Sequence, residues 1–182
     1  MSQAIGLVEF NSIAKGIEAA DAMIKSAQVN LITARSICPG KYIALVSGDI
    51  SAVENAVENG IRQGETAVVD DFILPNVHSS VISAITATTN VEKLYALGVI
   101  EVFSIAAAVV AADAAAKSAD VELIEIRLGI GIGGKSFITL TGDVAAVRAA
   151  VDAGVVMASE KGMLVDEAVI PSPRDEMAQW IL

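Results

Sequence analysis

The chain has 182 residues, of which 54% are hydrophobic, 4% aromatic and 19% charged, and its formal net charge is −10. The charged share lies below the roughly 25% of typical soluble domains, so we expect broad, weakly polar contacts between subunits. The acidic balance argues against nucleic acid as a partner, because its phosphates would be repelled. The most apolar run, Ile105 to Ala112, is too short to cross a bilayer, which needs about 20 residues. The N-terminus lacks a signal-peptide pattern and the single cysteine cannot close an internal disulfide, so we expect a cytoplasmic protein.

The sequence is a tandem repeat, with an offset between the copies that grows from 92 to 96 residues along the chain. The second copy carries two extra residues in its central loop, which account for the first change of offset. A linker-like Thr-Ala-Thr-Thr-Asn stretch separates the copies and predicts two domains, residues 1–90 and 91–182. The segments that match are Ala4–Glu9 with Ala96–Glu101, Lys25–Ala27 with Lys117–Ala119, Gly48–Asp49 with Gly142–Asp143, and Pro75 with Pro171.

Each copy predicts the same order of elements. In the first helix, Ile13, Ile17, Ala20 and Ile24 form the apolar stripe of an amphipathic helix, and Ser12 caps its start. The order β-α-β-β-α-β plus a terminal helix, twice over, predicts an α+β fold of two tandem ferredoxin-like sandwiches with helices on one face of each sheet. The elements expected in the first copy are strands 5–10, 29–35, 42–46 and 67–74, and helices after residue 12, around residues 53–60 and over residues 79–85.

These residues resemble the bacterial microcompartment (BMC) shell family. The resemblance rests on Ala4–Glu9, the helix segment Ala20–Ala27 and Ser47-Gly48-Asp49, on their second-copy equivalents, and on the ending Val169–Arg174. The tandem form is similar to shell proteins of propanediol-utilisation compartments. The resemblance implies a homotrimer of two-domain chains, a pseudohexameric tile that packs with other shell proteins into a polyhedral shell. We therefore expect a structural protein of the microcompartment shell and not an enzyme.

The one cysteine, Cys38, lies in the hairpin loop of the first copy. From the residues alone, a lone cysteine is most often a small buried hydrophobe. The family resemblance implies instead that the hairpin loops line the centre of the tile and that Cys38 is a ligand of a [4Fe-4S] cluster on the three-fold axis. Three symmetry-related copies would then supply three thiolates, and a fourth ligand would come from elsewhere. The residues expected around this axis are Ser36, Ile37, Pro39, Gly40, Gly129, Gly131, Ile132, Gly133 and Gly134.

The second hairpin loop, Leu128 to Ser136, contains glycines at the spacing of a dinucleotide fingerprint and of a phosphate-binding loop. Both motifs require a helix directly after the loop, whose N-terminal amides hold the phosphates. Here the following residues, Ser136 to Thr141, are β-branched and aromatic and predict a strand. We therefore expect a hairpin turn and not a nucleotide site.

Basic side chains recur near the ends of equivalent elements. A lysine near a helix C-terminus is explained by the helix dipole alone, whereas the resemblance implies that Lys25, Lys117 and Arg174 contact neighbouring tiles. In the first copy His78 stands where the second has Arg174, which puts the edge role of His78 in doubt. Glu9 and Glu101 occupy equivalent strands and predict separate, equivalent places instead of a catalytic pair.

Three functions follow from these patterns. The first is a shell tile whose cluster carries electrons across the shell or is delivered to an encapsulated redox enzyme. The second is a shell tile with a central metabolite pore and a free Cys38. The third is a ferredoxin-like protein that binds a small effector between its repeats.

Overall fold

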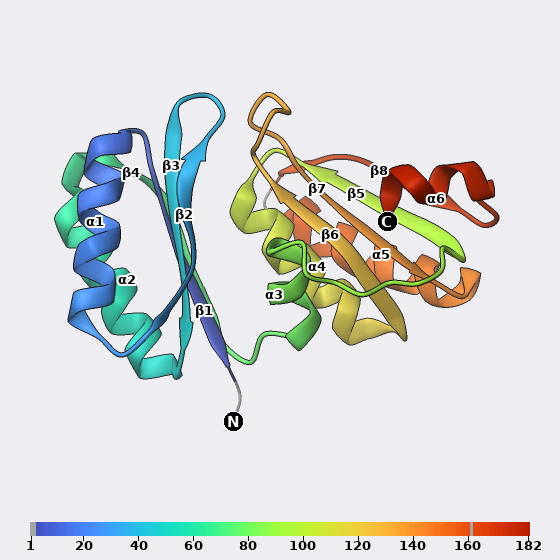
Figure 1. Cartoon of the computed structure of the whole chain (residues 1–182), viewed down its shortest axis with the longest axis horizontal. Coiled ribbons are helices and arrows are strands. Elements are labelled where there is room, and N and C mark those ends of the chain that lie inside the picture. The colour runs from blue at the N-terminus through green and yellow to red at the C-terminus, as the bar shows by residue number, and fades with distance from the viewer. Residues whose placement is uncertain (1–2, 161) are drawn as a thin grey trace. The chain divides into compact units, whose positions relative to one another are not determined.

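The computed structural model describes residues 3–160 and 162–182, and the chain divides into two compact units after Val77. Each unit is a four-stranded antiparallel sheet with two long helices on one of its faces (Figure 1). The predicted α+β ferredoxin-like architecture, present twice, is confirmed. No helix within the described ranges is long and apolar enough to cross a membrane.

The first unit has the strand order β2-β3-β1-β4, so that β1 is central and β2 is an edge strand. Strand β1 pairs with β3 through Leu7 and Leu45 and with β4 through Leu7 and Phe72. Its elements are β1 (Ala4–Phe10), α1 (Ile13–Ser26), β2 (Asn30–Ile37), β3 (Lys41–Gly48), α2 (Ile50–Gly64), a 3₁₀ turn (Glu65–Ala67) and β4 (Val68–Leu74).

The second unit repeats this plan with the order β6-β7-β5-β8 and adds a short helix before and after it. The preceding helix, α3, packs against β6 and α4, and the chain divides before it instead of after it. The predicted domain limits at residues 90 and 91 stay a prediction. The elements are α3 (Ser79–Ile85), β5 (Ala96–Val102), α4 (Ile105–Ser118), β6 (Val121–Leu128), β7 (Ser136–Gly142), α5 (Val144–Glu160), β8 (Leu164–Ile170) and α6 (Asp175–Ile181).

Small residues set the contact between helices and sheet. A methyl group added at Gly6 of β1 would lie 2.5 Å from Val57 Cγ2 and 2.7 Å from Val53 Cγ1, both on α2. Gly98, the equivalent on β5, approaches Val151 of α5 in the same way. The helices therefore pack directly on the central strand, and the core holds mainly aliphatic side chains.

The predicted apolar stripe of α1 is wrong for its three isoleucines and right for Ala20, which is buried. The residues that α1 buries are Gly16, Ala19, Ala20 and Met23. Ile13, Ile17 and Ile24, by contrast, are 42%, 54% and 41% exposed. Gly16 faces the ring of Tyr42, where a larger side chain would not fit, so the small residues make the contact and the isoleucines face outward.

We expect Gly6→Ala to lower the free energy of unfolding by about 1–3 kcal/mol, because the new methyl group overpacks the valines of α2. The matched control is Gly48→Ala, where the nearest atom to the added carbon is 3.4 Å away. Urea unfolding of both variants measures the difference. Equal midpoints for the two variants would show that α2 shifts away without cost.

Candidate functional site

Cys38 lies at the tip of the hairpin that joins β2 to β3 (Figure 1). The turn is closed by a hydrogen bond of 2.9 Å from the backbone N–H of Gly40 to the carbonyl of Ile37. Gly40 has a φ of 85°, which glycine adopts without strain. Cys38 is half-buried and the two residues after it are exposed, so the thiol is available from outside the chain. Of the residues expected in this loop, Ser36 and Ile37 belong to β2 instead, and Ile37 is buried.

The second hairpin loop joins β6 to β7, as the sequence predicted, and no helix follows it. Its glycines at positions 129, 131, 133 and 134 all have φ between 65° and 85°. An added side-chain carbon at Gly131 or Gly133 would meet no atom within 4 Å. This loop is an open, glycine-built turn, and it lacks the helix N-terminus that a phosphate site needs.

An ion pair fastens the base of each hairpin. In the first copy Lys41 Nζ lies 2.7 Å from Glu9 Oε1, and the Glu9 side chain is only 7% exposed. In the second copy Lys135 pairs with Glu101, whose side chain is 31% exposed. The two glutamates thus occupy equivalent places. Each pairs with a lysine at the start of the returning strand: Lys41 is the first residue of β3, and Lys135 immediately precedes β7.

The two hairpins differ at an equivalent arginine. Arg127 donates to both carboxylate oxygens of Glu125, at 2.7 and 3.0 Å, and lies over the ring of Phe137. In the first copy Thr33 stands at the position of Glu125, and among the described residues the buried Nε of Arg35 has no hydrogen-bond partner. Burial lowers the pKa of the Arg35 guanidinium. The hairpin that carries Cys38 therefore holds a half-buried arginine whose Nε is unpaired within the described residues, whereas the equivalent arginine of the second hairpin is neutralised by Glu125.

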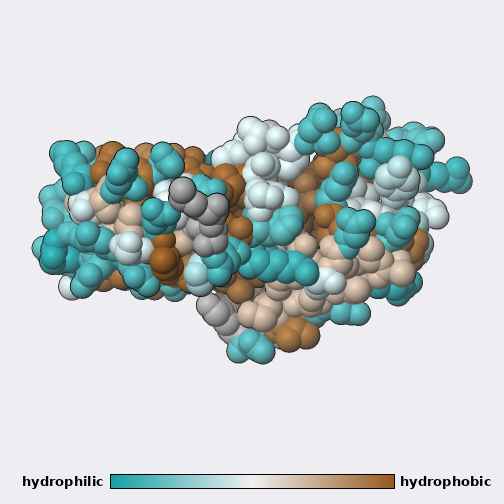
Figure 2. Space-filling model, turned by 90° about the horizontal axis from the view of Figure 1, so that it is seen from below, coloured by the Kyte–Doolittle hydropathy of each residue, from teal (hydrophilic) through white to brown (hydrophobic). Residues whose placement is uncertain are grey.

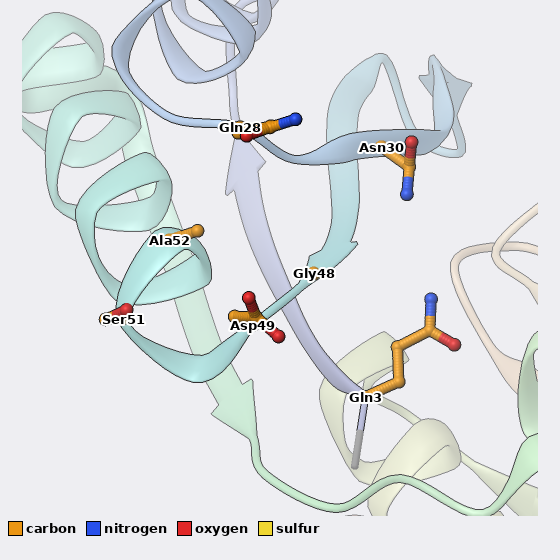
Figure 3. Close-up of a pocket in the computed structure, with 7 residues that line it drawn as sticks. All are labelled: Gln3, Gln28, Asn30, Gly48, Asp49, Ser51 and Ala52. Carbon is orange, nitrogen blue, oxygen red and sulfur yellow. The ribbon is translucent and has the colours of Figure 1, made fainter. Parts of the chain in front are cut away.

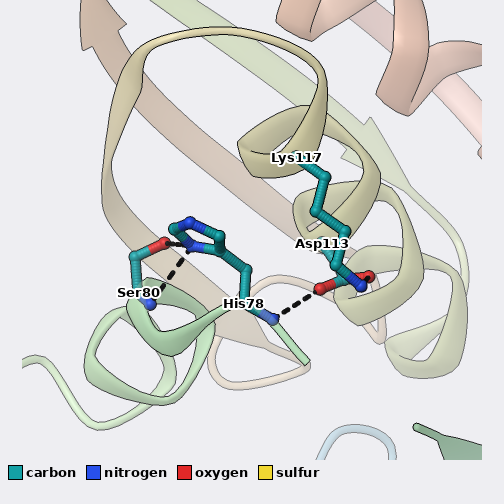
Figure 4. Close-up of polar contacts among 4 residues, drawn as sticks. All are labelled: His78, Ser80, Asp113 and Lys117. Atoms are coloured by element: carbon teal, nitrogen blue, oxygen red, sulfur yellow. Dashed lines mark hydrogen bonds and ion pairs between the residues drawn. The ribbon is translucent and has the colours of Figure 1, made fainter. Parts of the chain in front are cut away.

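His78 and Asp113 form a polar contact at the start of α3 (Figure 4). The backbone N–H of His78 donates to Asp113 Oδ1 at 2.8 Å, and Lys117 Nζ lies 2.5 Å from Asp113 Oδ2. The His78 ring turns back to Ser80, with Nδ1 2.7 Å from Oγ. His78 is therefore the half-buried N-cap of α3.

The lysines expected at the tile edge occupy equivalent places with different surroundings. Lys25 pairs with Asp21 at 2.5 Å on an exposed part of α1, where their side chains are 72% and 54% exposed. Lys117 pairs with Asp113, whose side chain is only 7% exposed. Arg174, the third expected edge residue, is exposed immediately before α6.

A polar depression of about 620 Å³ lies at the opposite end of the first sheet from the cysteine turn (Figure 3). Among the described residues that line it, Asp49 carries the one charge, and Gln3, Gln28 and Asn30 contribute side-chain amides. Sequence reasoning did not identify it, because these residues come from separate element ends and form no motif. No cluster of three or more His, Cys, Asp or Glu occurs within residues 3–160 and 162–182.

We expect Lys41→Ala to lower the free energy of unfolding by about 1–3 kcal/mol, because it leaves the buried carboxylate of Glu9 without a partner. Lys135→Ala is the matched control, with an expected loss below about 1 kcal/mol, because Glu101 keeps contact with water. Thermal and urea unfolding measure both. A larger loss for the Lys135 variant would contradict this assignment.

The BMC domain family model matches the chain twice, over residues 4–77 and 96–173. The chain is 46% identical over 177 residues to the microcompartment shell protein PduT of Citrobacter freundii, covering 97% of this chain and 96% of that protein. It is 32% identical over 188 residues to the carboxysome assembly protein CcmO of Synechococcus sp., covering 96% and 67%. A solved microcompartments protein from Desulfitobacterium hafniense DCB has a TM-score of 0.96 and 59% identity, covering 98% and 99%. The chain therefore belongs to the BMC-domain family, and it is a structural shell protein of a bacterial microcompartment that carries the domain in tandem.

Proposed function

We propose that three chains form a pseudohexameric tile whose central loops include Cys38, and that the tile packs with other shell proteins. The tandem fold supports this, because three chains supply six copies of one domain and cyclic symmetry closes them into a ring. The exposed apolar surface supports it as well: brown, hydrophobic atoms reach the surface among polar ones in Figure 2. Such surface is typical of subunits that associate.

The observation that carries the proposal is the place of Cys38 at the exposed end of a tight hairpin. One chain offers one thiol, and no cluster of metal-ligating residues accompanies it in the described part of the chain. A [4Fe-4S] cluster usually takes four cysteine ligands. The residues present therefore fit a cluster only when symmetry brings three thiols together, which the proposed ring would do.

In this tile Cys38 would hold the cluster and the hairpin would orient the thiol towards the axis. The Glu9–Lys41 pair stiffens the hairpin base, so the thiol keeps a defined position. When bound, a [4Fe-4S] cluster supplies one-electron chemistry. A tile of this kind would carry electrons across the shell, or deliver the cluster, to an encapsulated redox enzyme.

We expect the anaerobically purified protein to contain iron and sulfide at four atoms of each per three chains, with a visible charge-transfer spectrum. The Cys38→Ser variant should lose the iron, the sulfide and the visible spectrum, because a serine hydroxyl is a poor iron ligand. Light scattering should still give this variant the mass of a trimer. A trimer that never binds iron would favour the free-thiol pore. Full iron content in Cys38→Ser would remove Cys38 from the ligand set.

Tile packing is tested separately from the cluster. We expect Lys25→Ala combined with Arg174→Ala to abolish extended sheets seen by electron microscopy at high protein concentration, while the trimer persists. Lys15→Ala is the control, because this lysine lies on the same helix as Lys25 and also forms an ion pair within it, with Glu18, but is not one of the expected edge residues. Sheets of normal extent in the double variant would contradict the edge role.

A further inference from the structure

Arg35 is a cation close to Cys38 whose charge is left without a partner. It belongs to β2 and precedes Cys38 by three residues. Its side chain is half-buried, and its Nε atom is buried with no hydrogen-bond partner among residues 3–160 and 162–182. None of the ion pairs in that part of the chain includes Arg35. An arginine keeps its charge in a protein, and a buried donor without an acceptor costs free energy.

The second hairpin shows the same arginine with its charge neutralised. Arg127 occupies the same register on β6 as Arg35 does on β2. It donates to both carboxylate oxygens of Glu125, at 2.7 and 3.0 Å. Thr33 stands at the position of that glutamate in the first hairpin. The neutralising acid is therefore absent from the hairpin that carries the thiol and present in the one that does not.

The other cations of the two hairpins are paired as well. Lys41 lies 2.7 Å from a carboxylate oxygen of Glu9, and Lys135 pairs with Glu101. Within the described residues, Arg35 is thus the one hairpin cation with an uncompensated charge. Three strand residues span about 10 Å, which is about one Debye length in salt of about 0.1 M. A charge at this distance acts on the thiol without touching it.

We propose that Arg35 tunes the cluster that Cys38 would hold, because its unpaired guanidinium stabilises negative charge at the cysteine turn and thereby raises the reduction potential. This inference rests on the proposed tile, in which three chains bring three Arg35 side chains around one axis. Three thiolates give the site a net negative charge, and one-electron reduction increases it. Net charge is one of the factors that set the potential of such a site. Arg35 acts through its field and is a tuning residue, not a ligand.

A redox titration of the anaerobically purified trimer, followed by electron paramagnetic resonance, tests this role. We expect Arg35→Gln to lower the ratio of reduced to oxidised cluster at a fixed potential by about tenfold, which moves the midpoint about 59 mV to more negative values. This is the effect of a unit charge roughly 10 Å away at an effective dielectric constant of about 20. Arg35→Lys keeps the charge and should keep most of the potential. Thr33→Glu supplies the acid of the second hairpin and should reproduce Arg35→Gln with the arginine still in place.

The matched control changes the second hairpin. Glu125→Thr combined with Arg127→Gln removes a neutral pair, so the midpoint potential should stay unchanged. Glu125→Thr alone frees the charge of Arg127 and should raise the potential.

A second readout needs no cluster. After a chelator has removed the iron, Cys38 is the one cysteine that can be alkylated. The rate constant with anionic iodoacetate, divided by that with neutral iodoacetamide at the same pH, reports the local charge, because the fraction of thiolate cancels. We expect Arg35→Gln and Thr33→Glu to lower this ratio by about threefold at low ionic strength, and high salt to remove the difference.

The outcomes separate this inference from the tile. A midpoint potential that Arg35→Gln and Thr33→Glu leave unchanged overturns the tuning role and leaves the cluster proposal standing. An equal shift in Arg35→Lys and Arg35→Gln assigns the effect to packing instead of charge and also overturns the tuning role. A trimer that binds no iron overturns the cluster proposal, and the tuning role falls with it.

Discussion

The structure depends on a close approach between helix and sheet at one residue of each central strand. Gly6 and Gly98 allow the valines of α2 and α5 to lie directly on β1 and β5. With the helices this close, a layer of small aliphatic side chains fills the space between, and few aromatic residues are needed. Both long helices lie on the same face of each sheet, and the edge strand β2 of the first sheet keeps an exposed leucine, Leu31, whereas α3 packs against the edge strand β6 of the second.

The two copies show how the same surface behaves with and without a neighbour. Asp113 and Leu123 are buried in the second unit, whereas their equivalents Asp21 and Leu31 are exposed in the first. Sequence divergence does not explain this difference, because both pairs are identical in residue type. The difference arises because α3 packs against β6 and α4 in the second unit and covers this surface. The equivalent surface of β2 and α1 in the first unit is exposed.

Much of the fold could be predicted because duplication supplies an internal comparison. The changing offset located the longer loop, and the β-branched run after Lys135 identified a hairpin where the glycine spacing alone suggested a phosphate loop. The stripe of α1 was mispredicted at Ile13, Ile17 and Ile24, because these exposed apolar residues have the helical spacing of residues that face the core. Gly16, not Ile17, makes the contact with the sheet. Hydrophobicity cannot separate the two faces when both are apolar.

The ligand environment of Cys38 could not be predicted from one chain by physical reasoning, since any companion ligands belong to other molecules. The sequence indicated the loop, and the structure adds the exposed tip and the buried Glu9 at its base. Fusing the two unlike hairpins into one polypeptide fixes their ratio at one to one. Any ring built from whole chains in head-to-tail order alternates a thiol loop with a glycine loop. Either loop can then diverge without the mixed assemblies that separate subunits would produce.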